Sequence, residues 1–576
     1  MEKTKRKRRG FNFVPIIGIT GFAVVLVIII FLVKRYAPSR HILPLTEFYP
    51  VTEGEILVVM QDEVMEQRGI FIEDRVYLEY NQVTAYLNKR FYWDYNENLL
   101  LYTTPTSVIK VIPGEHNYTV NKNKKKTDYE VAKLNGDKVY LALDFIELYT
   151  DLSYKIYDNP DRVVITYKYG QKLLFTETKK KVAVRKKAGI KSDIVSKVAK
   201  GSKLQCIDEN AESVNGFLHI ITEDGVKGYI SARATKTPFE EKMKSNTGFR
   251  KEKYSHISKD YKINLVWHQV YNQDANNQLS SLLEKTKGIN TICPTWFRIL
   301  DTEGSISSIA SESYVAKAHS LGIEVWALTT DVDTDIDMHE IFSYTSKREK
   351  LEKELLAQAI KYDLDGINLD FERISKDTAA SYLQFIREMS IKCRKNDIVL
   401  SIDNYVPTEY TAYYDRKEQA AVADYIMTMA YDEHYAGGGE SGSVASIGYV
   451  DLAIDRSLEE IPAKQLLLGI PFYTRLWKEV TQQDGTLKVT AESYGMVSSW
   501  NKMKDVNVTP EWDDETEQYY GEYESDGAVY KMWLEDENSI EKKVERAYEN
   551  ELAGTAAWKL GMEKKEVWSV IQKYMN

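Results

Sequence analysis

Apolar and polar residues alternate strictly through a short segment in the second half of the chain, residues 365–372. In an extended strand, successive side chains point to opposite faces. One face of this segment carries Ile367, Leu369 and Phe371, and the opposite face carries Asn368, Asp370 and Glu372. The pattern predicts a strand that packs its apolar face on helices and presents two carboxylates together. An edge strand with a solvated polar face is the alternative, but the flanking apolar residues favour a central strand.

Further apolar strands, separated by helical stretches, recur to the end of the chain. The eight predicted strands are residues 263–268, 289–295, 323–329, 366–372, 398–403, 425–431, 466–472 and 555–560. This alternation predicts an α/β fold, a (β/α)8 TIM barrel, over residues 261–576. The segment between the seventh and eighth predicted strands, residues 473–550, is too long for a single connecting helix. Its own alternating pieces predict a small α+β insertion at about residues 474–550.

The preceding part of the chain consists of smaller modules. Residues 45–170 contain a weak internal repeat, in which each copy reads as strand, short helix and strand-turn-strand. These small α+β repeat modules are predicted to form a stalk, either a spacer or a wall-binding element. Residues 171–236 have short strands with turn residues between them, a pattern typical of a small β barrel. The polar segment 237–260 reads as a linker.

The beginning of the chain has a different pattern. A basic tail, residues 1–12, precedes residues 13–33, which contain no charged residue and are followed by Lys34 and Arg35. A run of this length predicts one transmembrane helix, with the basic tail in the cytoplasm and the remaining chain outside the cell. The predicted location is therefore the cell membrane, with a single pass. A cleaved signal peptide is the alternative, although the residues after the run make a poor cleavage site.

Charge and cysteine content narrow the possible partners. The first 40 residues carry a net charge of +8 within an overall charge of −10, which leaves −18 for the remainder. Nucleic acid is therefore not expected as a partner, since its binding needs a basic surface. Three dispersed cysteines predict small buried residues rather than a disulfide framework. The acidic run 331–337 lacks the glycine and the closing glutamate of a calcium loop, so no metal is expected.

The predicted active site lies where the barrel strands end, at their C-terminal edge. Glu372 ends the fourth strand, and Asp370 lies two residues earlier on the same face, close enough for their charges to interact. Tyr431 and Asp432 end the sixth strand, and Trp558 lies in the eighth. Carboxylates can handle protons while aromatic faces hold a sugar ring, so this combination favours sugar chemistry. Taken singly, Tyr431 and Trp558 are of a kind that more often packs in a core than contacts a ligand.

These residues resemble a known family. Asp365, Asn368, Asp370 and Glu372 match the DxxDxDxE pattern of glycoside hydrolase family 18, with asparagine replacing the middle aspartate. Residues 429–432 match its MxYD element, and the last-strand tryptophan follows in order. Residues 468–473 and 558–561 resemble the sporulation- and cell-wall-associated branch that cleaves peptidoglycan. The repeat modules resemble the copper amine oxidase N-terminal domain, and residues 171–236 resemble bacterial SH3 domains.

The resemblance implies retaining hydrolysis in which the substrate's own 2-acetamido group is the nucleophile, with no metal or cofactor. Glu372 would protonate the glycosidic oxygen and later activate water. Asp370 would orient and stabilise the acetamido group, and Tyr431 would hydrogen-bond its carbonyl oxygen. Asp432 would help position this group, and Trp558 would close the pocket. The expected substrate is an N-acetylglucosamine-containing glycan, peptidoglycan rather than chitin.

Four further residues are predicted to contact substrate: Asp365, Asn368, Asn404 and Trp296. Asn368 departs from the family pattern, which has an aspartate at this position. The amide cannot ionise, so the position carries no negative charge in this chain. Three alternative functions remain: a catalytically inactive glycan-binding protein on the same barrel, a structural cell-wall protein, and a chitinase. The joint presence of Glu372, Asp370 and Tyr431 favours the enzyme.

Overall fold

A computed structural model describes the backbone of residues 14–332 and 334–575, with side chains described from residue 22 onward. The predicted basic tail, residues 1–12, lies outside these residues. Helix α1 (Val14–Tyr36) covers most of the predicted membrane segment. Crossing a bilayer takes about 20 consecutive apolar residues, and no helix in the described part of the chain is both long and apolar enough. The predictions of a transmembrane helix at 13–33 and of a membrane partner are therefore not supported.

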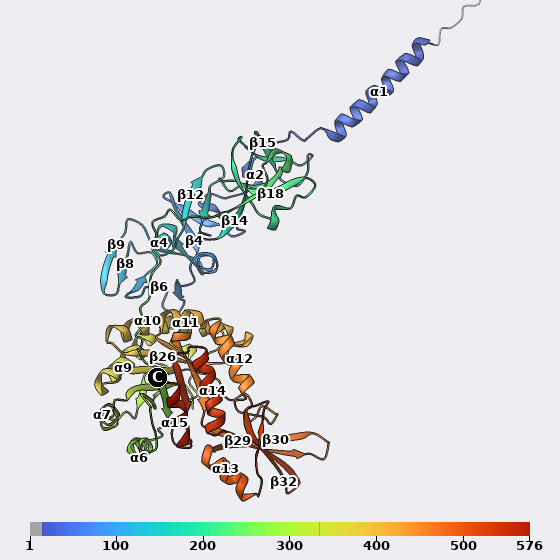
Figure 1. Cartoon of the computed structure of the whole chain (residues 1–576). Helices are drawn as coiled ribbons and strands as arrows, with labels where there is room; N and C mark the ends of the chain where they lie inside the picture. The colour runs from blue at the N-terminus through green and yellow to red at the C-terminus, as the bar shows by residue number, and fades with distance from the viewer. Residues whose placement is uncertain (1–13, 333, 576) are drawn as a thin grey trace, which may run out of the picture. The chain divides into compact units, whose positions relative to one another are not determined.

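The described chain forms two compact units, shown in Figure 1. The first contains residues up to 89, residues 113–117 and residues 126–251, and the second contains residues 90–112, 118–125 and 252–575. Part of the segment predicted as stalk thus belongs to the same unit as the barrel. The predicted linker is divided, since β20 (Phe239–Lys242) pairs with β14 (Lys172–Glu177), while Ile257 N–H donates to Asp424 of the barrel at 2.8 Å.

The first unit contains two sheets. In one, the strand order is β10-β11-β4-β3-β1-β13-β12, and in the other it is β16-β15-β19-β18-β17-β14-β20. The first sheet is built from β1 (Glu55–Met60), β3 (Gly69–Ile72), β4 (Arg75–Glu79), β10 (Ala132–Asn135), β11 (Lys138–Ala142), β12 (Ser153–Tyr157) and β13 (Arg162–Thr166). The second also contains β15 (Val182–Arg185), β16 (Ile194–Val198), β17 (Lys203–Cys206), β18 (Phe217–Ile221) and β19 (Lys227–Ser231). The second sheet includes the predicted SH3-like region.

The second unit contains the predicted barrel. Its eight parallel strands are β21 (Ile263–His268), β22 (Thr291–Ile299), β24 (Glu324–Thr330), β25 (Gly366–Asp370), β26 (Val399–Tyr405), β27 (Tyr425–Met429), β28 (Leu466–Pro471) and β34 (Gly554–Trp558). Each pairs with its neighbours in that order, and β21 pairs with both β22 and β34, which closes the ring. The short strand β23 (Ile306–Ser308) adds antiparallel to β22. The TIM-barrel prediction is confirmed.

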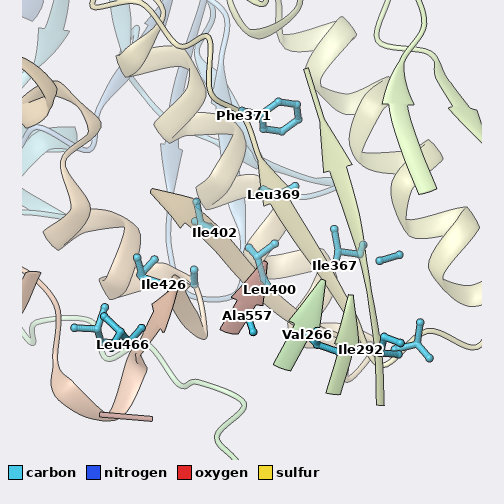
Figure 2. Close-up of a cluster of buried hydrophobic side chains, with 14 of the residues drawn as sticks. Val266, Ile292, Ile367, Leu369, Phe371, Leu400, Ile402, Ile426, Leu466 and Ala557 are labelled. Carbon is cyan, nitrogen blue, oxygen red and sulfur yellow. The ribbon is translucent and has the colours of Figure 1, made fainter. Parts of the chain in front are cut away.

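Helices surround the ring and cover the outward faces of its strands: α7 (Glu312–Ser320), α9 (Thr345–Tyr362), α10 (Ala379–Lys395), α11 (Arg416–Val422), α12 (Ile447–Leu458), α14 (Glu537–Glu549) and α15 (Glu566–Lys573). Figure 2 shows the apolar side chains of this layer, among them Ile367, Leu369 and Phe371. Phe371 packs edge-on against Phe342, with ring centroids 5.4 Å apart. The predicted apolar face of β25 is therefore confirmed, and its polar face points into the barrel. Because β24 and β26 flank β25, the edge-strand alternative is wrong.

Gly366 starts β25 at a point where only glycine fits. A Cβ there would lie 2.6 Å from the ring of Trp326, in the neighbouring strand β24. The missing side chain lets the large indole fill the bottom of the barrel next to β25.

An insertion separates β28 from α14, as predicted. It is an antiparallel sheet of β29 (Tyr473–Thr481), β30 (Leu487–Gly495), β31 (Glu511–Asp513), β32 (Gln518–Ser525) and β33 (Ala528–Leu534), with helix α13 (Met496–Asp505). One side of the sheet buries Leu476, Met532 and Leu534 with Met503 of α13. The predicted insertion ran to about residue 550, but residues 537–549 form α14, which packs against β28 and β34 of the barrel.

A small five-stranded sheet lies against the barrel helices, with the strands in the order β5 (Tyr92–Asp94), β6 (Leu99–Thr103), β7 (Val108–Val111), β8 (Asn117–Val120) and β9 (Asn123–Lys126). The fully buried carboxylate of Asp94 accepts hydrogen bonds from the backbone N–H (2.7 Å) and the hydroxyl (2.6 Å) of Thr345, which begins α9. Gln384 of α10 donates to Thr103 at 2.9 Å. The Arg348 guanidinium lies over the Tyr92 ring, 4.9 Å from its centroid. Because these contacts are buried, the small sheet stabilises the unit that contains the barrel.

Asp94→Ala is expected to lower the free energy of unfolding by about 2–4 kcal/mol, because it leaves several buried donors without an acceptor. Thermal melting of the purified protein measures this. Asp455→Ala, on the exposed side of α12, is the matched control and should change stability by less than about 0.5 kcal/mol. Equal melting temperatures for Asp94→Ala and the parent would contradict the structural role of the sheet.

Candidate active site

A cavity of about 620 Å³ opens at the C-terminal ends of the barrel strands. Among the predicted site residues, the structure brings together Asp370, Glu372, Tyr431, Asp432 and Trp558 in its lining. Trp267, Asp403, Tyr405 and Tyr473 also line it. The cavity therefore combines carboxylates with aromatic rings, which suits a sugar ligand.

Glu372 lies two residues beyond the last residue of β25, where backbone hydrogen bonds hold it in place. Asp331, fully buried at the end of β24, accepts the N–H of Glu372 at 2.9 Å and that of Arg373 at 3.0 Å. The hydroxyl of Tyr405, the last residue of β26, donates to Oε2 of Glu372. Burial is the main cause that raises the pKa of Glu372, and the hydrogen bond from Tyr405 acts in the opposite direction. A carboxyl group with a raised pKa is suited to donate a proton.

Asp370 points to the same interior face as Glu372 and lies deeper. Burial, followed by the charge of Asp403, raises the pKa of Asp370 well above its usual value. The pKa of Asp403 is itself raised to about 8, mainly by burial. Like charges in a buried site disfavour each other's ionisation, so the two carboxyl groups raise the pKa of the pair.

Asn368 occupies the barrel interior and does not line the cavity. Its amide nitrogen donates to Asp403 Oδ1 at 2.8 Å and to the Ser401 hydroxyl at 3.1 Å. Its carbonyl oxygen lies 3.4 Å from both Trp267 Nε1 and Cys293 Sγ. Asn368 therefore contacts Asp403 from deeper in the barrel and is not placed to touch a ligand in the cavity.

The remaining predicted residues form the wall of the cavity. Asp432 adopts a left-handed backbone conformation with φ = 56°, which aspartate tolerates better than most residues. Its carboxylate accepts hydrogen bonds from the Tyr473 hydroxyl (2.6 Å) and from Arg475 (2.7 Å) of strand β29. The Tyr431 ring meets Tyr473 edge-on, at 6.2 Å between centroids. Trp558 packs against Trp267 with ring centroids 6.1 Å apart.

Three predicted contact residues lie away from the cavity. Asp365 precedes β25 at the opposite end of the strand, where it binds His319 Nε2 and the N–H of Val325, both at 2.8 Å. Asn404 points outward from β26 and donates to Gln419 of α11 at 2.7 Å. Trp296 follows a register shift in β22 and packs its ring against Tyr314 of α7. All three positions are explained by packing of the outer layer.

Asp331, Asp403, Tyr405 and Arg475 are site residues that the sequence prediction missed. Two of them follow the alternation that identified β25: in β26, Ser401, Asp403 and Tyr405 share one face. That signal is present in the sequence. Asp331 and Arg475 reach the site through tertiary contacts that no local pattern encodes.

No metal site is found in the residues that the structure describes: no group of three or more histidine, cysteine, aspartate or glutamate side chains is placed to hold an ion. Asp333, within the acidic run, lies outside those residues. The three cysteines are buried and free, as predicted.

Tyr405→Phe is expected to move the alkaline limb of the kcat/KM profile to higher pH. The hydroxyl stabilises the Glu372 carboxylate, so its removal raises the pKa of Glu372 and keeps the acid protonated to higher pH. A shift of about 0.5–1 unit is expected from a single hydrogen bond. A pH profile measured on one glycan substrate gives the result, and a shift to lower pH would contradict the assignment.

Comparison with known proteins agrees with this geometry. Residues 336–563 match the model described as glycosyl hydrolases family 18. The chain carries a glycosyl hydrolase family 18 domain. Residues 180–236 match the bacterial SH3 domain, and residues 58–166 match the copper amine oxidase N-terminal domain. The three predicted resemblances are confirmed.

Relatives of the family 18 domain include two proteins of Bacillus subtilis. The uncharacterized glycosylase YvbX is 26% identical over 314 residues, which cover 51% of this chain and 87% of YvbX. A cortical fragment-lytic enzyme is 25% identical over 241 residues, 40% of this chain and 54% of that enzyme. The C-terminal domain of a predicted chitinase from Desulfitobacterium hafniense superposes with a TM-score of 0.50 at 18% identity, covering 55% of this chain and that whole domain. This structural likeness concerns the fold.

Proposed function

We propose that the protein is a retaining glycosidase that hydrolyses an N-acetylglucosamine-containing glycan, peptidoglycan in the first place, outside the cytoplasm. The observation that carries the proposal is the cavity that Glu372, with its raised pKa, lines together with the half-buried Asp370 and Tyr431. The cortical fragment-lytic relative supports peptidoglycan over chitin. The bacterial SH3 module, a domain type often found beside wall-cleaving enzymes, supports an extracytoplasmic location.

Cleavage begins with proton transfer from Glu372 to the glycosidic oxygen. Backbone hydrogen bonds to Asp331 fix the start of the Glu372 side chain, and Tyr405 orients its carboxyl group. As the bond breaks, positive charge develops on the sugar, and the acetamido oxygen of the same sugar attacks the anomeric carbon. The acetamido oxygen and the anomeric carbon are now joined in a five-membered ring. The ionised Glu372 takes a proton from a water molecule while the water oxygen attacks the anomeric carbon, which breaks the bond to the acetamido oxygen. Two inversions at the same carbon give net retention.

Asp370 and Tyr431 hold the acetamido group during this step. A carboxylate at position 370 accepts the amide N–H, and its negative charge offsets the positive charge that develops on the amide. The Tyr431 hydroxyl donates to the amide oxygen, which orients that oxygen toward the anomeric carbon. Trp558 and Trp267 supply the apolar surface against which the sugar ring packs.

The proposal is tested with peptidoglycan, chitin and the N-deacetylated form of each. We expect release of soluble fragments from N-acetylated peptidoglycan, and at least about 100-fold slower release after deacetylation, because the nucleophile is then absent. Proton NMR of the first products should show retained anomeric configuration. Inverted products, or equal rates on acetylated and deacetylated glycan, would contradict the mechanism.

A further inference from the structure

A buried carboxylate, Asp403, lies on the strand next to Asp370. The strand register pairs Asn368 with Ser401 and Leu369 with Ile402, so the next pair in the same register is Asp370 and Asp403. Neighbouring strands are about 4.8 Å apart, and residues paired in this way point to the same face. Asp403 is only 4% exposed, yet it lines the cavity.

The surroundings of Asp403 contain no positive charge among the described groups that act on it. The ionisable groups that interact with it are Asp370, Glu372, Cys293, Tyr382 and Tyr431. Its neutral neighbours are the Asn368 amide on β25 and, through that amide, Ser401, Trp267 and Met427. Two adjacent carboxylates in such a site are stabilised when one proton lies between them.

We propose that Asp370 and Asp403 share one proton, and that Asp403 retains it when the substrate binds. Asn368 donates to Oδ1 of Asp403, which leaves Oδ2 as the oxygen that carries the proton. When the acetamido N–H arrives at Asp370, the proton moves from Asp370 to Asp403, and Asp370 becomes the carboxylate that the reaction needs. No proton is exchanged with solvent in this step. Asp403 is thus a positioning residue, and this inference rests on the proposed function.

The same arrangement explains why asparagine is tolerated at position 368. The family pattern places an aspartate there, next to Asp370 along the strand. In this chain the second carboxylate comes from the neighbouring strand β26, and the amide of Asn368 connects to it by a 2.8 Å hydrogen bond. The carboxylate pair is preserved, although one of its members has moved to another strand.

Infrared titration of the substrate-free protein labelled with 13C-aspartate tests the shared proton without any substrate. The parent should show a protonated aspartate carboxyl at pH 7 that titrates only at higher pH. In Asp403→Asn and in Asp370→Asn this signal should move to lower pH, since the remaining carboxylate has lost its charged neighbour. An unchanged signal in Asp403→Asn would overturn the proposal.

The second test measures kcat, KM and the pH profile of variants in which the carboxylate is removed from position 403 or moved to position 368. Asp403→Asn should lower kcat by about tenfold or more, with KM changed less than about threefold. It should also move the acid limb of the pH profile up by about one unit, because a lone carboxyl ionises less readily than a pair whose anion is stabilised by the shared proton. The double variant Asn368→Asp/Asp403→Asn returns a carboxylate to the pair and should recover most of the lost kcat and restore the acid limb. Asn368→Asp alone, which adds a third carboxylate, should move the acid limb to higher pH.

A wild-type pH profile in Asp403→Asn, or a double variant no better than Asp403→Asn, would overturn the role of Asp403. Thermal melting identifies any variant that has simply lost stability. If the parent hydrolyses no N-acetylated glycan, the proposed function fails, while the infrared titration still decides whether the proton is shared. The two failures are therefore distinguishable.

Discussion

Replacing Glu372 by glutamine is expected to lower kcat by about 10²–10⁴-fold while glycan binding changes by less than about threefold. Loss of a positioned general acid costs this much in other enzymes. Glutamine has nearly the same shape, and its carbonyl oxygen can still accept the hydroxyl of Tyr405. It has no proton to donate to the glycosidic oxygen. Initial rates and binding isotherms on one soluble glycan measure the two quantities.

Glu433→Gln is the matched control for this experiment. Glu433 lies next to Asp432 but binds the N–H of Ser446 at 2.8 Å and does not line the cavity. Its substitution should leave kcat within about threefold of the parent. Equal losses in the two variants would show that a general change of charge near the cleft, rather than acid catalysis, causes the effect.

Asp370→Asn is expected to cause the second large loss, about 10²–10³-fold in kcat. The substitution removes the negative charge that opposes the positive charge developing on the acetamido group. Since this charge develops only in the transition state, KM should change much less than kcat. Steady-state kinetics on an N-acetylated oligosaccharide separate the two constants.

Two outcomes would contradict this role of Asp370. A loss that falls wholly on KM would mean that Asp370 serves only ground-state binding. A normal kcat in Asp370→Asn would mean that another residue stabilises the positive charge on the acetamido group. Asp365→Asn is the control from the same strand segment: its carboxylate binds Val325 and His319 away from the cavity, so its effect should appear in the melting temperature and not in kcat.

Sequence periodicity was sufficient to predict the barrel and the shared face of Asp370 and Glu372, because both depend on local alternation. The apolar and polar faces of β25 follow directly from residues 366–372. The same rule explains the misplaced Asn404: it is one residue from Asp403, and one step along a strand turns a side chain to the opposite face. Asp365 matched a family pattern but lies five residues from Asp370, at the other end of the strand.

Other features depend on contacts between distant segments. Asp331 and Glu372 are adjacent only because β24 and β25 pair in one particular register. Asp432 is held by Arg475, which reaches it from the inserted sheet. Strands β5 and β6 lie within the predicted repeat modules, yet they pack in the unit that contains the barrel. No local pattern encodes such pairings, so the sequence could not predict them.

The central claim is that Glu372 acts as the proton donor in hydrolysis of an N-acetylated wall glycan. The most direct measurement is mass spectrometry of the new reducing ends formed when the purified protein or its Glu372→Gln variant is incubated with peptidoglycan. We predict new N-acetylglucosamine reducing ends with the parent protein and a loss of at least about 100-fold with the variant. Equal release by both proteins, or binding of peptidoglycan by the parent without any new reducing end, would contradict the account.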